Sequence, residues 1–268
     1  AVVRPRPGGS GGGRDNAPMT SETKLAQVKE AIARSQRLRT LSACSNITAI
    51  DRLKINDHGP THVRIVTRIA LRILELLHGA GVRLGVTDHG LGYEEAQVVV
   101  LLGAALHDVG HAIHRADHEL FSMILAPTLL DELLTGIYDE PVRTVLLAET
   151  MHAIWAHRAA VRPLTVEGGV LKVADALDME KGRARIPFRV GEPTIHSVSA
   201  LAIEKVEIKP GREKPVHIHV RMTNSAGIFQ LDSLFKEKLM TSGLREYIEV
   251  SAEIEGEEKK IIGRYTLD

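Results

Sequence analysis

The segment Ala104-Ala-Leu-His-Asp-Val-Gly-His-Ala-Ile-His-Arg-Ala-Asp-His118 is the most informative part of this sequence. It places four histidines and two aspartates within a dozen residues, directly after the apolar run of residues 96–106. An apolar run without a polar stripe predicts a buried helix. The sequence therefore predicts a helix that carries a polar cluster into the interior at its C-terminal end.

The residue types in this cluster indicate a metal site. His107 and Asp108 lie at the predicted helix end, where neighbouring side chains point about 100° apart, so both can face one ion. Gly110 supplies a backbone at which the helix can stop, and further imidazoles follow it at His111, His114 and His118. Imidazole nitrogen and carboxylate oxygen are ligands of divalent ions such as Zn, Fe, Mn, Ni and Mg. The alternative is a histidine-rich loop that is simply solvated.

Length and composition limit the classes of protein that need to be considered. A chain of 268 residues can hold one sizeable domain with an appendage, or two small domains. Lys plus Arg and Asp plus Glu both number 34, so no global positive field points to nucleic acid, although a local basic patch stays open. The single Cys44 excludes an internal disulfide and suits a reducing cytosol. Because no long apolar run is free of charges, we expect a soluble, cytoplasmic protein without a membrane segment.

The N-terminal third predicts a disordered leader followed by two helices. Residues 1–23 are too rich in Gly and Pro to bury an apolar core. Residues 24–41 show helical spacing of apolar side chains and predict one amphipathic helix. A further helix begins near Pro60, which suits a first helical turn, and His62 lies on its buried stripe with Val66 and Ile69. His58 precedes this helix and is expected to be solvated.

The middle of the chain predicts four more helices, over residues 93–108, 119–134, 140–157 and 166–181. In the second of these, Leu120, Ile124 and Leu125 are expected in the core. His152 and His157 point about 140° apart on the third, so only one is expected to face a site. Asp175 lies among apolar neighbours on the fourth, where a carboxylate needs a compensating cation. That cation is either a metal ion or, alternatively, Lys172.

The C-terminal part changes in pattern and predicts a small α+β module. Strands are expected over residues 197–208, 216–222, 246–255 and 260–267, with a helix over residues 227–239. His217 and His219 share one face of a predicted strand, where we expect surface or cross-strand roles. The predicted domains are therefore a leader (1–23), a helical metal-binding domain (24–190) and an α+β module (191–268).

Taken together, these residues resemble the HD-domain metal-dependent phosphohydrolase superfamily, over residues 54–185. Its signature is a His, a His-Asp pair and a distant Asp on helices of a bundle, and His62, His107-Asp108 and Asp175 match it. The resemblance implies a mostly α fold, an HD-type helical bundle followed here by the small C-terminal α+β module. Members with two ions add two histidines, and the contexts of His118 and His157 are similar to these.

The resemblance also implies an activity. Two divalent ions, of Mn, Fe, Ni, Zn or Mg, would share Asp108 and activate water against a phosphate mono- or diester, with a nucleotide as the expected substrate class. Lys181 and Arg185 are candidates for binding the phosphate, and His111 or His114 for handling a proton.

Two alternatives stay open at this stage. One is a non-catalytic regulatory or binding module that keeps its metal for structure, with a homodimer formed through the C-terminal module. The other is a ribonuclease-like phosphodiesterase, because residues 174–178 and 182–185 are similar to the ribonuclease Y branch of the superfamily.

Overall fold

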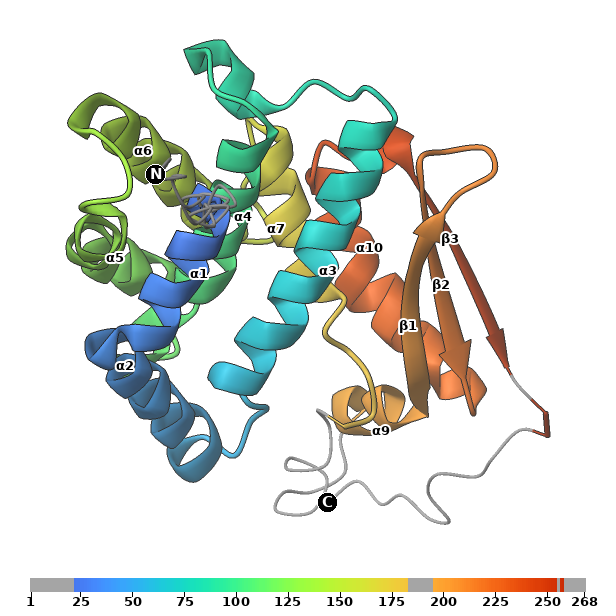
Figure 1. Cartoon of the computed structure of the whole chain (residues 1–268). Helices are drawn as coiled ribbons and strands as arrows, with labels where there is room; N and C mark the ends of the chain where they lie inside the picture. The colour runs from blue at the N-terminus through green and yellow to red at the C-terminus, as the bar shows by residue number, and fades with distance from the viewer. Residues whose placement is uncertain (1–21, 183–194, 255, 258–268) are drawn as a thin grey trace, which may run out of the picture.

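The computed structural model describes residues 22–182, 195–254 and 256–257, and it shows a helical bundle beside a small sheet (Figure 1). This arrangement confirms the predicted fold class. The bundle consists of α1 (Lys24–Arg34), α2 (Gln36–Asn46), α3 (Pro60–Gly79), α4 (Tyr93–Leu106), α5 (His118–Leu134), α6 (Glu140–Ala156) and α7 (Val166–Ala176), with the short helical segments η1 (Ile47–Arg52), η2 (Gly85–His89) and η3 (Val109–Ala112) between them.

The apolar helix α4 lies at the centre of the bundle. It packs against α3, α6 and α7, and its side chains from Val98 to Leu106 are all buried. A helix that is apolar on every side is stable in water only when other helices cover it. The surrounding helices therefore converge on α4, and their ends converge on the residues that follow it.

The first predicted helix is in fact two helices that meet at Ser35. Ser35 ends α1 and begins α2 with an extended backbone, and its hydroxyl accepts the N–H of Leu38. The same hydroxyl donates to Glu132 on α5 at 3.2 Å. The prediction of one helix over residues 24–41 was wrong because apolar spacing continues across a serine that caps the second helix.

The predicted core face of α5 was wrong for Leu120 and Ile124, whereas Leu125 is half-buried and packs against the core. Leu120 and Ile124 are 46% and 64% exposed, whereas Ser122, Ala126 and Leu129 are buried. The side chains of this helix are apolar on several sides, so their pattern does not fix its rotation. The hydroxyl of Ser122 is hydrogen-bonded to the backbone of His107 and Gly110, and these bonds turn the face that carries Ser122 toward the interior.

The C-terminal module is a three-stranded sheet with short helices. Its elements are α9 (Ile195–Ala202), β1 (Ile203–Pro210), β2 (Val216–Met222), η4 (Ser225–Gly227), η5 (Gln230–Phe235), α10 (Lys236–Thr241), η6 (Arg245–Tyr247) and β3 (Ile248–Ile254). β1 and β2 form the expected antiparallel hairpin, and β3 pairs with β2 in parallel. The first predicted strand begins too early, because residues 197–202 belong to α9. The predicted strand 260–267 lies outside the described residues.

The sheet packs one face against the bundle. Val216, Ile218 and Val220 alternate as fully buried residues on β2 and join the apolar core of the bundle, and β1 and β2 both contact α3. His217 and His219 lie on the other face, where both bond the hydroxyl of Ser251 across the strands. That outcome agrees with the cross-strand role expected for them. The proposed domain boundary at residue 190 falls in a segment that the structure does not describe.

A glycine lets the module approach α7 closely. A Cβ at Gly169 would lie 2.5 Å from the carbonyl oxygen of Ser242, just after α10. Thr241 adds a bond by donating its hydroxyl to the carbonyl of Ala159 at 2.9 Å. This backbone contact leaves no room for a side chain at position 169 of α7.

We predict that Gly169→Ala destabilises the protein. The added methyl meets backbone rather than a flexible side chain, so overpacking should lower the free energy of unfolding by about 1–3 kcal/mol. Urea unfolding measures this change. Gly79→Ala is the matched control, since a Cβ there meets nothing within 4 Å, and it should stay within about 0.5 kcal/mol of the wild type. Equal stability of both variants would contradict the close docking.

Candidate metal centre

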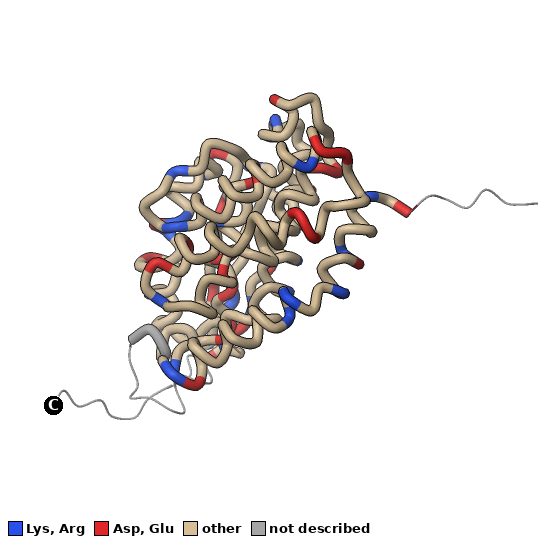
Figure 2. The backbone as a smooth tube through the Cα atoms, turned by 90° about the vertical axis from the view of Figure 1, so that its left-hand side faces the viewer, with Lys and Arg blue, Asp and Glu red and all other residues tan. Residues whose placement is uncertain are grey.

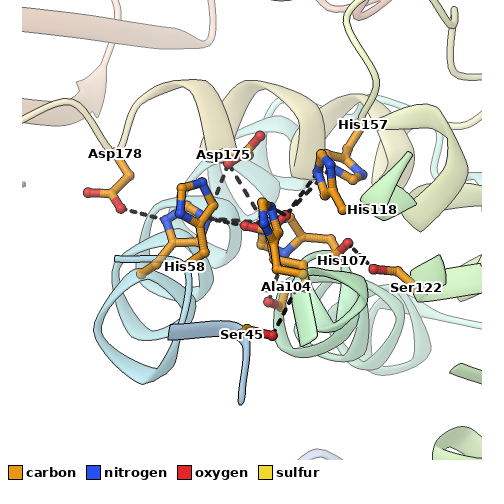
Figure 3. Close-up of polar contacts among 12 residues, drawn as sticks. Ser45, His58, Ala104, His107, His118, Ser122, His157, Asp175 and Asp178 are labelled. Atoms are coloured by element: carbon orange, nitrogen blue, oxygen red, sulfur yellow. Dashed lines mark hydrogen bonds and ion pairs between the residues drawn. The ribbon is translucent and has the colours of Figure 1, made fainter. Parts of the chain in front are cut away.

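Five helical segments deliver the predicted ligands to one buried point. His62 lies in the first turn of α3, His107 and Asp108 follow α4, His118 begins α5, His157 follows α6 and Asp175 lies in the last turn of α7. Figure 3 shows the side chains of Asp175, His107, His118 and His157 directed toward one another. All four histidines are at most 9% exposed. The structure thus brings together every residue that the sequence proposed as a metal ligand.

One oxygen of Asp108 faces a first group of ligands. Its Oδ2 lies 3.3 Å from Nε2 of His62 and 3.4 Å from Nε2 of His107. Oδ1 of Asp175 completes the group, 3.3 Å from Nε2 of His62 and 3.7 Å from Nε2 of His107. Ligand atoms bound to one ion at about 2.1 Å lie roughly 3.0–3.4 Å apart, so this spacing suits a divalent ion.

The other oxygen of Asp108 faces a second group. Its Oδ1 lies 3.2 Å from Nε2 of His118, 3.6 Å from Nε2 of His111 and 4.0 Å from Nε2 of His157. Asp108 therefore stands between two sets of imidazoles and offers one oxygen to each. This is the arrangement by which one carboxylate can serve two ions.

Hydrogen bonds fix the ring nitrogens of the first group. Nδ1 of His62 lies 2.5 Å from a carboxylate oxygen of Asp178, and Nδ1 of His107 lies 3.0 Å from the carbonyl of Ala104. Because both partners accept, each Nδ1 carries a hydrogen, and in the neutral ring each Nε2 then has a lone pair.

The second group is fixed in the same way. Nδ1 of His157 lies 2.5 Å from the carbonyl of Ile154. Nδ1 of His118 lies 3.1 Å from the carbonyl of Arg115 and 3.4 Å from the guanidinium of the same residue. Four imidazoles thus turn their Nε2 atoms toward Asp108. Acceptors on the far side of a histidine ring are typical of metal ligands.

The contact between His62 and His107 supports a bound cation. Their Nε2 atoms lie 3.1 Å apart, and in the neutral rings, with each hydrogen held at Nδ1, both nitrogens present a lone pair to the other. Two facing lone pairs and two carboxylates repel one another in a buried site, whereas a cation between them would bind all four. The donor set therefore fits a divalent metal ion.

Asp175 has a cationic partner from the C-terminal module. Lys238 on α10 donates to its Oδ2 at 2.5 Å. The alternative of a salt bridge to Lys172 was wrong, because that ammonium donates to the carbonyls of Ala159 and Val161. Burial raises the pKa of Asp175, but the charge of Lys238, together with the neighbouring imidazoles, outweighs burial and holds this pKa well below its usual value.

Gly110 and Ser122 hold the turn after α4 against α5. The hydroxyl of Ser122 donates to the carbonyl of His107 at 2.6 Å and accepts the N–H of Gly110 at 2.9 Å. A Cβ at Gly110 would lie 2.0 Å from the carbonyl oxygen of His118. Glycine is required here by close approach, and not by the helix-stopping backbone that the sequence suggested.

Two residues near the centre were not predicted from the sequence. Asp178 binds His62 and was not among the ligands or partners predicted from the sequence. His58 was expected in solvent, but it is half-buried with its ring centre 4.4 Å from that of His111. The phasing of a short helix end could have indicated Asp178, whereas no sequence signal indicates the position of His58.

Other candidates lie elsewhere or are already paired. Lys181 forms an ion pair with Glu204 at 2.9 Å, and Arg185 lies outside the described residues. His114 is exposed and accepts the N–H of Ala116. His152 accepts the N–H of Leu164, away from the site.

Comparisons with known proteins agree with this site. Residues 61–180 match the HD domain family. The chain is also 40% identical over 241 residues to an uncharacterized protein of Methanocaldococcus jannaschii, MJ1020, covering 90% of this chain and 93% of that protein. No solved structure matches. The chain belongs to the HD-domain superfamily of metal-dependent phosphohydrolases.

We predict that Asp178→Ala weakens metal binding by about tenfold or more, because His62 loses the acceptor that orients its ring. Calorimetric titration of metal-stripped protein with Mn²⁺ measures the affinity. Asp178→Asn should fall between wild type and Ala, since its amide oxygen still accepts. An unchanged affinity in the Ala variant would show that His62 needs no orienting partner.

We predict that acid destabilises the metal-free protein. Burial, aided by the charges of His107 and Lys238, lowers the pKa of His157 to about 3, while the unfolded imidazole titrates near 6.5. Between these values only the unfolded chain binds this proton, so the free energy of unfolding falls as the pH drops below about 6.5, by ~1.4 kcal/mol per pH unit for this group.

Urea unfolding in chelator at about pH 7 and about pH 5 tests this dependence. His157→Asn should take up about one proton fewer on unfolding than the wild type. The same pH dependence in both proteins would rule out the contribution of His157.

Proposed function

We propose that this protein is a metal-dependent phosphohydrolase that cleaves a phosphate mono- or diester, with nucleotides as the substrate class. The observation that carries the proposal is the position of Asp108, whose two oxygens each face a separate group of imidazole nitrogens. A structural ion needs one closed ligand set, and a second set around the same carboxylate favours a two-ion hydrolase.

The described residues divide into two ligand groups under this proposal. His62, His107 and Asp175 would hold one ion, His118 and His157 the other, and Asp108 both. Bound divalent ions would supply an activated water and neutralise phosphate oxygens as charge builds in the transition state. The buried Nδ1 partners keep the imidazoles from turning away.

His111 is the proposed proton-handling residue. Its Nε2 lies 3.2 Å from the guanidinium of Arg115 and near Asp108, and its Nδ1 is buried without a partner among the described residues. Burial lowers its pKa, so this imidazole is neutral at pH 7 and suited to accepting a proton. The phosphate role proposed for Lys181 loses support because Glu204 already pairs with it, and that of Arg185 stays a prediction.

The proposed partners are small phosphorylated molecules. Basic and acidic residues are interspersed along the chain instead of separating by sign (Figure 2), which favours a small substrate over a long polyanion. In the described part of the chain, no helix combines the length and apolar character that crossing a membrane requires. A cytoplasmic location and a homodimer through the C-terminal module remain predictions.

We predict that protein stripped of metal and reloaded with Mn²⁺ or Fe²⁺ hydrolyses a generic phosphodiester or monoester reporter. Asp108→Ala removes the ligand common to both groups, so its activity should fall to that of the metal-free protein. Release of the reporter chromophore measures the rate. Asp88→Asn, a change in an exposed carboxylate of η2, should keep full activity. Turnover that survives chelation or the loss of Asp108 would refute the proposed mechanism.

A further inference from the structure

Lys238 is a cation that the C-terminal module places beside the metal ligands. Its side chain is 21% exposed, and its ammonium bonds Oδ2 of Asp175 at 2.5 Å. The other oxygen of Asp175 faces His62 and His107. One carboxylate therefore connects the ammonium to the first group of ligands.

The ammonium has unused hydrogen-bonding capacity. A lysine carries three N–H donors, and Asp175 is the only hydrogen-bond partner of the Lys238 ammonium among the residues that the structure describes. By contrast, Lys172 donates to two carbonyls and Lys181 is paired with Glu204. Of these three lysines near α7, Lys238 alone combines proximity to the ligands with free donors.

The position of Lys238 is set by packing. One turn later on α10, Thr241 bonds the carbonyl of Ala159, and the following Ser242 touches the backbone space left by Gly169. Lys238 projects from the same short helix toward Asp175, two turns along α7 from Gly169. Contacts between α10 and its surroundings thus hold Lys238 beside Asp175.

We propose that Lys238 is a catalytic residue that binds a non-bridging phosphoryl oxygen of the substrate while Asp175 holds its ammonium in place. An ammonium is a compact point charge with rotatable donors, so it can serve a carboxylate and a phosphoryl oxygen at once. A donor that is fixed in place before the substrate binds stabilises the negative charge that develops on the phosphoryl oxygens in the transition state. This inference rests on the proposed function.

Binding of inorganic phosphate to Mn²⁺-loaded, full-length protein tests the role of Lys238 without relying on turnover. Calorimetry gives the phosphate affinity, and elemental analysis gives the metal bound per chain. Lys238→Met should bind phosphate about tenfold or more weakly than the wild type, because a charged hydrogen bond is lost, while its metal content stays unchanged. Lys238→Arg keeps the charge and should retain part of the affinity.

Lys236→Met is the matched control, since Lys236 lies on the same helix, is 64% exposed and pairs with Asp232. It should bind phosphate as the wild type does. Circular dichroism and the melting temperature of each metal-free variant establish that it is folded. If Lys238→Met is not folded, the phosphate affinity of Lys238→Arg tests the role of Lys238 instead.

The outcomes separate this inference from the proposed function. Wild-type phosphate affinity in a folded, metal-loaded Lys238→Met protein would overturn the role of Lys238 and leave the hydrolase proposal standing. Loss of metal together with loss of phosphate would overturn it too, since Lys238 would then act only through Asp175. A wild-type protein that binds no metal would defeat the proposed function itself.

Discussion

A buried carboxylate surrounded by imidazoles is the constraint on which the rest of the structure depends. Asp108 is 5% exposed, and a charge removed from water to this extent is costly unless cations or hydrogen bonds compensate it. Helices α3, α5, α6 and α7 meet this requirement because each has one end close to Asp108 and carries a polar residue of the site at that end. The apolar exterior of α4 draws these helices together, and the short turn after it, packed against Ser122, sets the direction of the carboxylate.

Much of this arrangement could be predicted from the sequence, and the exceptions have physical causes. The apolar run of α4, Pro60 at the start of α3 and the spaced histidines indicated the bundle and the positions that converge. Leu120 was assigned to the core because an apolar side chain does not by itself fix the rotation of a helix. Lys238 was missed because its partner Asp175 is distant in sequence, and a single chain carries no signal for such a pair. Asp178 could have been indicated by the phase of the helix end that carries Asp175.

The C-terminal module is part of the same folded body as the bundle. Its sheet buries one face against α3, and α10 lies against α7 at the glycine that permits backbone contact. The bundle supplies all of the candidate metal ligands, whereas the module supplies a charge next to them. Features that distinguish this protein from other HD-domain proteins with the same ligand set would then lie in the module and not in the bundle.

The parallel pairing of β2 with β3 has a topological consequence for α10. The chain leaves the end of β2, forms α10 and must return along the whole sheet before β3 can begin beside the start of β2. This crossover tethers the helix at both ends to backbone-paired strands. The helix can therefore move away from the bundle only as far as its connections to β2 and β3, residues 223–235 and 242–247, allow.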